Sequence, residues 1–163
     1  MIKINKFKIG CLAIISCIII IIIGICIFNY GNPNKYLTLR KSSPDFEYLG
    51  NEKYVNDSTS FEFSGFNGTW SLITFDSIKD NKITINNNSK INEGEFYVVI
   101  LDSDYKAIII DKSNKKKLEF TTSKNGKYII RVAGKNAGGI FEMKINSSNP
   151  ISISHHDIYN LEY

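Results

Sequence analysis

Histidine is the side chain most often used for acid–base chemistry near neutral pH. The chain has two, His155 and His156, which are adjacent and are followed by Asp157. A Ser/His/Asp catalytic triad needs one histidine held between its serine and aspartate partners on a rigid scaffold. Neighbouring histidines in a terminal segment are poorly placed for this, so we expect a solvated tail here and no catalytic function. Imidazole also suits Zn, Cu and Ni, but one of two adjacent rings would face away from the ion, and we predict no metal site.

Two pairs of carboxylates are the other groups that could carry chemistry. Asp102 and Asp104 lie in a predicted turn, but the sequence around them lacks the glycine and distal glutamate of an EF-hand calcium loop. Glu93 and Glu95 precede a predicted strand, where their backbones would lie about 6.6 Å apart, within the range of glycosidase pairs. Nothing in the flanking sequence separates this pair into an acid and a base. We therefore expect no catalytic residue, no cofactor and no enzyme; a hydrolase acting on the cell envelope is the alternative.

Apolar and polar residues alternate with period two through most of the chain after residue 57, and no window carries a helical stripe. Turn signals such as Gly65-Phe66-Asn67-Gly68 and Asn125-Gly126 separate the alternating segments. The pattern predicts an all-β fold, an antiparallel, jelly-roll-like β-sandwich of about eight strands. The expected strands cover residues 61–64, 69–76, 82–85, 96–101, 107–110, 118–120, 128–132 and 141–145, with candidate edge strands at 36–39 and 46–49.

The predicted hairpin of residues 96–110 is apolar on both faces. The face that carries Val98 and Ile100 must fill the core. The other face is either covered by residues 36–49 or 151–163, or exposed as a patch that seeks a partner. We take this second face as the candidate partner-binding surface, and its residues are Tyr97, Val99, Leu101, Ile108 and Ile110.

The sequence GKYIIRVAG at residues 126–134, followed by AGGIF at 137–141, resembles a recurring terminal hairpin. It is similar to the closing strands of small extracytoplasmic β-sandwich domains of low-GC Gram-positive bacteria, in the style of pre-peptidase C-terminal domains. Residues 61–68 and 93–96 fit the same layout, and the resemblance covers residues 58–146. It implies a fold and a compartment. Such domains are mostly non-catalytic modules, so the resemblance assigns no functional residue.

Residues 9–28 form an uncharged run in which seventeen of twenty residues are apolar. As a helix this run would be about 30 Å long, the thickness of a bilayer's hydrocarbon core. We predict a single transmembrane anchor with its N-terminus inside and the rest of the chain outside the cytoplasmic membrane. A cleaved secretory signal is one alternative, and lipidation at Cys17, which follows a lipobox-like triplet, is another. Three lysines precede the run: Lys3, Lys6 and Lys8.

The average composition is dominated by this N-terminal segment. All three cysteines lie in it, at positions 11, 17 and 26, so the rest of the chain can form no disulfide. Seventeen of the twenty basic residues and all sixteen acids follow residue 29, which makes that part nearly neutral. The run Lys115-Lys116-Lys117 is expected to flank a hairpin turn. The charge pattern therefore argues against nucleic acid as a partner.

These patterns divide the chain into a membrane anchor or signal segment (1–29), a linker with edge strands (30–57), a β-sandwich (58–146) and a C-terminal tail (147–163). The many tyrosines suit stacking on sugar rings or anchoring a protein. We therefore predict a membrane-tethered, extracytoplasmic, non-catalytic binding or accessory module that contacts a protein partner or an envelope glycan. Besides the hydrolase, the alternative is a structural subunit whose anchor pairs with a membrane partner.

Overall fold

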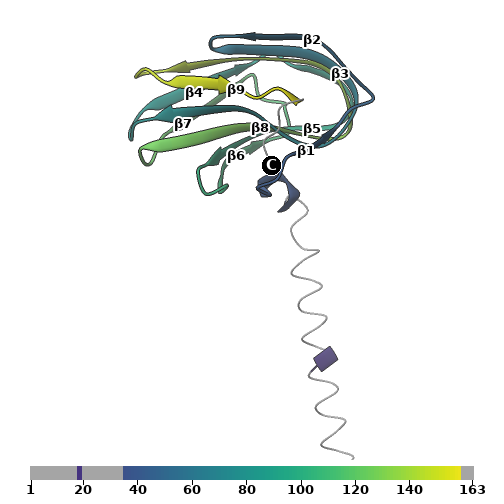
Figure 1. Cartoon of the computed structure of the whole chain (residues 1–163), viewed down its shortest axis with the longest axis horizontal. Coiled ribbons are helices and arrows are strands. Elements are labelled where there is room, and N and C mark those ends of the chain that lie inside the picture. Colours follow the sequence, from purple (N-terminus) through teal and green to yellow (C-terminus); the bar gives the residue numbers. More distant parts are fainter. Residues whose placement is uncertain (1–17, 20–34, 159–163) are drawn as a thin grey trace, which may run out of the picture. The chain divides into compact units, whose positions relative to one another are not determined.

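The computed structural model describes residues 18–19 and 35–158, and the chain divides into two units, residues 1–35 and 36–163 (Figure 1). Ile18 and Ile19 are helical. Among the described residues, no helix is both long enough and apolar enough to cross a bilayer. Apart from these two isoleucines, the predicted anchor at residues 9–28 lies outside the described residues, as does Cys17.

The second unit consists mainly of antiparallel β-strands that follow one short 3-10 helix, η1 (Lys35–Thr38). Two strands, β3 and β8, are far longer than the others and run through the middle of the sheet. In chain order the strands are β1 (Ser43–Asp45), β2 (Tyr48–Val55), β3 (Ser58–Ser77), β4 (Lys82–Asn87), β5 (Lys90–Asp102), β6 (Ala107–Asp111), β7 (Lys117–Thr121), β8 (Gly126–Ser147) and β9 (Ser152–His155).

β3 and β8 pair along nearly their whole length, and each of them has different neighbours at its two ends. The first half of β3 pairs with β2, whereas its second half pairs with β1 and β9. The first half of β8 pairs with β5 and the end of β8 with β4. At one end the strand order is therefore β7-β4-β8-β3-β2, and at the other β6 and β5 lie beside β8. Figure 1 shows how these strands curve over.

β-Bulges let the long strands bend. The register between β3 and β8 shifts around Phe66, and the register between β5 and β8 shifts around Glu93. Gly68 lies in the first bulge with φ of 98°, and a Cβ there would collide with the carbonyl oxygen of Ser43. Gly94 in the second has φ of 66° and faces the carbonyl of Asn136 equally closely. Glycine is needed at both bends because they combine a left-handed backbone with close approach of another strand.

The bend brings aromatic rings from both ends of the sheet into one core. The ring centroids of Phe61 and Trp70 lie 5.4 Å apart. Phe120 of β7 lies 6.0 Å from Tyr128 of β8, so the two ends of the sheet face each other across this core. Trp70 is completely buried. Burial of large aromatic side chains is the main favourable term in holding a sheet of this kind closed.

The predicted antiparallel β-fold is confirmed, with corrections. The described residues form nine strands, and all nine belong to one hydrogen-bonded sheet. Residues 65–68, predicted as a turn, are a bulged stretch inside β3. Residues 36–39, a candidate edge strand, lie mostly in η1 instead, because Leu37 is drawn into the protein and is fully buried.

Candidate functional site

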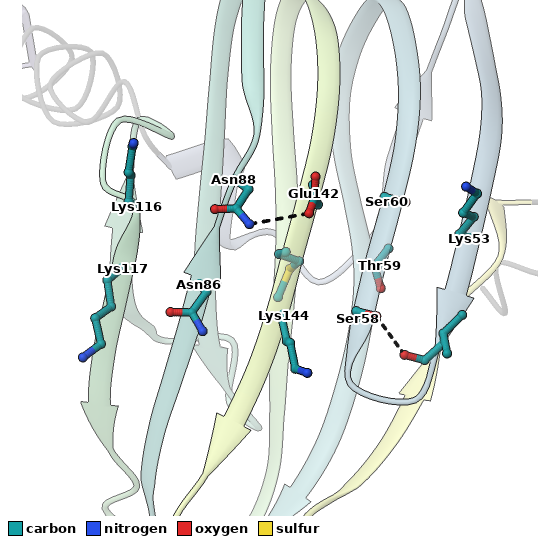
Figure 2. Close-up of a pocket in the computed structure, with 12 residues that line it drawn as sticks. Lys53, Ser58, Thr59, Ser60, Asn86, Asn88, Lys116, Lys117, Glu142 and Lys144 are labelled. Carbon is teal, nitrogen blue, oxygen red and sulfur yellow. Dashed lines mark hydrogen bonds between the residues drawn. The ribbon is translucent and has the colours of Figure 1, made fainter.

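The structure forms a hollow on the outward face of β7-β4-β8-β3-β2, with a volume of about 730 Å³ (Figure 2). We call this surface the lysine face. Its strands alternate strictly: in β4, Ile83 and Ile85 are buried in the core while Thr84 and Asn86 point outward. The lining residues are Lys53, Val55, Ser58, Thr59, Ser60, Asn86, Asn88, Lys116, Lys117, Glu142, Met143 and Lys144.

One row of side chains crosses all five strands of the lysine face. Asn86 is in register with Lys117 of β7 on one side and Lys144 of β8 on the other. Lys144 is in turn paired with Ser58, and Ser58 with Val55. Because neighbouring strands are about 4.8 Å apart, the backbones of Lys117 and Lys144 lie about 10 Å from each other.

The next row contains Glu142, Ser60 and Lys53, which occupy neighbouring positions on β8, β3 and β2. Asn88 Nδ2 donates to Glu142 Oε1 at 3.5 Å. Figure 2 shows Lys116 and Lys117 at one side of the hollow and Lys53 at the other, with Lys144 between them. Four lysines therefore surround a single carboxylate in the lining.

Two of the four lysines pair with acids beside the hollow. Lys117 Nζ lies 3.0 Å from Glu119, and Lys144 Nζ lies 3.4 Å from Asp57, with all four side chains at least 40% exposed. Hydrogen bonds from Lys117 and Lys82 lower the pKa of Glu119. Exposed ion pairs of this kind contribute little stability, so these lysines can exchange their partners for a ligand at little cost.

The other two lysines are available as they stand. Among residues 35–158, neither Lys53 nor Lys116 has an ion-pair or hydrogen-bond partner for its ammonium group. The same holds for the amide of Asn86 and the hydroxyl of Ser60, within the same part of the chain. The lysine face thus presents charged and neutral hydrogen-bond donors on the central strands of a rigid sheet.

The candidate face predicted on residues 96–110 is partly covered. Val99 and Leu101 are fully buried beneath Leu37, in a small second core with Ile129 and Ala133. They cannot contact a partner, because residues of η1 lie over them. Three of the predicted residues keep surface: Tyr97 is partly buried, Ile108 is 39% exposed and Ile110 is 41% exposed.

Arg131 of β8 binds η1 and the residue after it, and the Arg131 side chain is completely buried. Its Nη1 donates to the carbonyls of Leu37, at 3.0 Å, and of Leu39, while its Nε and Nη2 donate to Ser71 Oγ at 3.1 and 2.9 Å. Burial lowers the pKa of its guanidinium, which the nearby ring of Tyr105 opposes. Arg131 is thus held by carbonyl and hydroxyl oxygens.

The two histidines lie at an ordered edge of the sheet. His155 ends β9, which pairs with β3. Its Nδ1 lies 3.1 Å from Thr59 Oγ1, and its Nε2 lies 3.0 Å from the carbonyl of Asn56. His156 Nε2 lies 2.9 Å from Thr74 Oγ1. The solvated tail predicted here is therefore wrong for residues 152–156, because β9 adds a strand to β3. No cluster of three or more His, Cys, Asp or Glu suited to a metal occurs in the described residues.

The carboxylates singled out by sequence do not line the hollow. Lys112 lies 2.7 Å from Glu95 and lowers the pKa of that exposed carboxyl. Asp102 accepts hydrogen bonds from the backbone N–H groups of Asp104 and Lys106 at 2.9 and 3.0 Å. Burial acts to raise the pKa of Asp102, but these hydrogen bonds and Lys124 lower it overall. The partners of Glu95 and of Asp102 therefore stabilise the ionised form of each carboxylate, and these contacts hold the local structure of the chain.

Sequence reasoning missed the lysine face. Its lysines come from three distant segments, β2, the β6–β7 turn with β7, and β8. One signal was available: Asn86, Glu142 and Lys144 occupy the outward positions of strands whose inward positions are apolar, and the basic run 115–117 leads into a neighbouring strand. The sequence did not reveal that these strands are neighbours.

No protein-family model and no curated protein matches the chain. Among solved structures, the chain is similar to the crystal structure of Aeromonas hydrophila PliG, a periplasmic lysozyme inhibitor of g-type lysozyme. The identity is 17%, the match covers 63% of this chain and 92% of that one, and the TM-score is 0.36. A similarity of this size identifies no family and carries no inference about function.

Proposed function

We propose that the protein is a membrane-tethered, non-catalytic binding module that holds an envelope component or a partner protein on its lysine face, outside the cytoplasmic membrane. The observation that carries the proposal is the hollow of about 730 Å³ lined by four lysines and by asparagine and serine side chains. Convergent polar groups in a concavity of a rigid scaffold are the usual form of a binding site.

The chemistry of the lining supports binding. Lysine ammonium groups, asparagine amides and serine hydroxyls all donate hydrogen bonds, and several of these groups have no partner in residues 35–158. The single carboxylate of the lining, Glu142, is held by Asn88. Groups of this kind can hold a ligand by charge and by hydrogen bonds, which supports a binding role.

The tether is part of the proposal. Its support is the apolar run of residues 9–28, which would hold the chain in the cell membrane as a single-pass protein with the β-domain outside. A secreted form, or a form lipid-anchored at Cys17, would place the same domain in the same compartment. The membrane is therefore one proposed partner, through residues 9–28, and the occupant of the lysine face is the other.

A block of the lysine face that leaves its charge unchanged tests the proposal. Ser60 lines the hollow between Glu142 and Lys53, and its hydroxyl has no hydrogen-bond partner in the described residues. In the full chain held in zwitterionic nanodiscs, Ser60→Trp should fill the hollow and abolish binding to envelope material of the source cells from which the membranes have been extracted with detergent. Ser103→Trp is the matched control, because Ser103 is exposed in the β5–β6 turn. Envelope binding that survives Ser60→Trp would show that the lysine face is not the binding surface.

A further inference from the structure

We propose, building on the function above, that the ligand of the lysine face is a linear polymer with phosphate groups along its length. The lining contains four lysines, Lys53, Lys116, Lys117 and Lys144, and one acid, Glu142. Glu119 and Asp57 beside the hollow pair with Lys117 and Lys144, so the unpaired positive charge of the face is that of Lys53 and Lys116, which have no partner among residues 35–158. The lysine face is therefore a basic surface on a part of the chain that is nearly neutral as a whole, and it favours an anionic ligand.

The layout of the charges favours an extended ligand over a small ion. Lys117 is on β7, Lys144 is two strands away on β8, and Lys53 is a further two strands away on β2, one row along. With about 4.8 Å between strands, the backbone positions that carry these lysines extend over about 20 Å across the sheet. A single phosphate or metal-bound anion would contact one lysine, whereas a chain with repeated charges would contact all of them in turn.

The groups between the lysines fit the bridging parts of such a chain. Asn86 lies between Lys117 and Lys144 in one row, and Ser60 lies next to Lys53 in the other. Their amide and hydroxyl have no hydrogen-bond partner in residues 35–158, so they are available to ester or hydroxyl oxygens of the ligand. Aromatic rings, which would favour stacking on sugars, are not among the lining residues of this hollow.

Phosphate suits a surface whose cations are lysines. The forked guanidinium of arginine recognises carboxylates and phosphates alike, whereas lysine binds phosphate as a point charge. The chain has two arginines, and neither lines the hollow: Arg131 is buried on β8 and Arg40 lies near Tyr105. The basic groups of the lysine face are all lysines.

A polymer also fits better than a membrane surface. The lining includes Ser58 and Ser60 of the central strand β3, with lysines on strands to either side of it. A flat bilayer would reach the lysines at the sides and leave the hydroxyls of the hollow uncontacted. A flexible chain can follow the hollow and use both.

The test measures binding of an end-labelled inorganic polyphosphate to the full chain in zwitterionic nanodiscs, by fluorescence anisotropy over a range of salt concentrations. The variant K53Q/K116Q/K117Q/K144Q should weaken binding about tenfold or more and flatten its salt dependence. The matched control, K79Q/K106Q/K127Q/K135Q, removes the same charge from exposed lysines outside the lining and should change affinity less than about twofold.

Two further probes identify the class of ligand. Poly-L-glutamate of similar length should bind more weakly than polyphosphate, and vesicles that contain phosphatidylglycerol should not compete for the face. Equal losses in the two quadruple variants would overturn the proposal, because bulk charge alone would explain binding. Tighter binding to polyglutamate, or binding to the vesicles instead of polyphosphate, would overturn it as well.

The envelope assay separates failure of this inference from failure of the proposed function. If Ser60→Trp abolishes envelope binding but K53Q/K116Q/K117Q/K144Q does not, the lysine face binds a ligand that is not a polyanion, and only this inference is wrong. If Ser60→Trp has no effect, the proposed function itself is wrong. Thermal unfolding followed by circular dichroism shows that each variant is folded.

Discussion

Arg131 is the residue on which the order of the N-terminal part of the β-domain depends. It is buried in full and donates to the carbonyls of Leu37, Leu39 and Arg40, and to Ser71. A buried guanidinium is costly unless its N–H groups are satisfied. Here three backbone carbonyls and the Ser71 hydroxyl accept hydrogen bonds from these N–H groups. The arginine and the segment that follows residue 35 therefore stabilise each other.

We predict that Arg131→Ala lowers the free energy of unfolding by about 3 kcal/mol, because it leaves buried carbonyls without donors and opens a cavity. Urea denaturation of the full chain in detergent micelles measures this loss. Arg40→Ala is the control: Arg40 is exposed over the same Tyr105 ring, and its loss should cost less than about 0.5 kcal/mol. Equal losses for the two arginines would contradict the role given to Arg131.

At the scale of elements, the shape of the sheet depends on the bulges in β3, β5 and β8. Gly68 lies in the β3 bulge, where β1 crosses closely. The bulge lies between the first half of β3, which pairs with β2, and the second half, which pairs with β9. The lysine face is the outward side of one of the two ends that the bend creates.

We predict that Gly68→Ala destabilises the protein by about 2–3 kcal/mol more than Gly126→Ala. Both glycines have positive φ, 98° and 133°, but a Cβ at Gly68 meets the carbonyl oxygen of Ser43, whereas a Cβ at Gly126 has nothing within 4 Å. The difference in unfolding free energy therefore isolates the close approach from the backbone conformation. Similar losses at both positions would show that β1 moves aside freely.

At the scale of the whole molecule, the boundary between the two units lies at residue 36, where the second unit begins. Leu37 is fully buried, Arg131 binds the segment after it, and Ser42 Oγ donates to Ser71 Oγ at 3.1 Å. Of the predicted linker 30–57, the part from residue 36 onward thus belongs to the folded domain.

We expect a chain that starts at residue 36 to unfold at the same temperature as the full chain. A chain that starts at residue 43 should unfold about 10 °C lower, because it lacks Leu37 and leaves Arg131 without its carbonyl partners. Differential scanning calorimetry of the two truncated chains measures the difference. If both unfold at one temperature, residues 36–42 do not contribute to the stability of the domain.

Much of the fold could be predicted from the sequence, because alternation is a local property. All eight expected strands fall within strands of the structure, although two pairs of them are continuous there as β3 and β8. The sequence did not predict that β3 continues through a bulge at Gly65 and Gly68, because glycine is equally typical of a turn and of a bulge. The strand β9 was missed because its order comes from pairing with β3.

The sequence by itself determined three properties: the apolar N-terminal run, the absence of cysteine from the remainder, and the antiparallel β character of that remainder. The first two depend on composition alone, and the third depends on the alternation of apolar and polar residues with a period of two. The tertiary structure alone decided where the charges lie. Lys53, Lys117 and Lys144 are far apart in the sequence and become neighbours on one face only through strand pairing. In the sequence, Arg131 is an ordinary residue of a predicted strand. Only the fold places the segment after residue 35 over its side chain, because burial is a property of the assembled sheet.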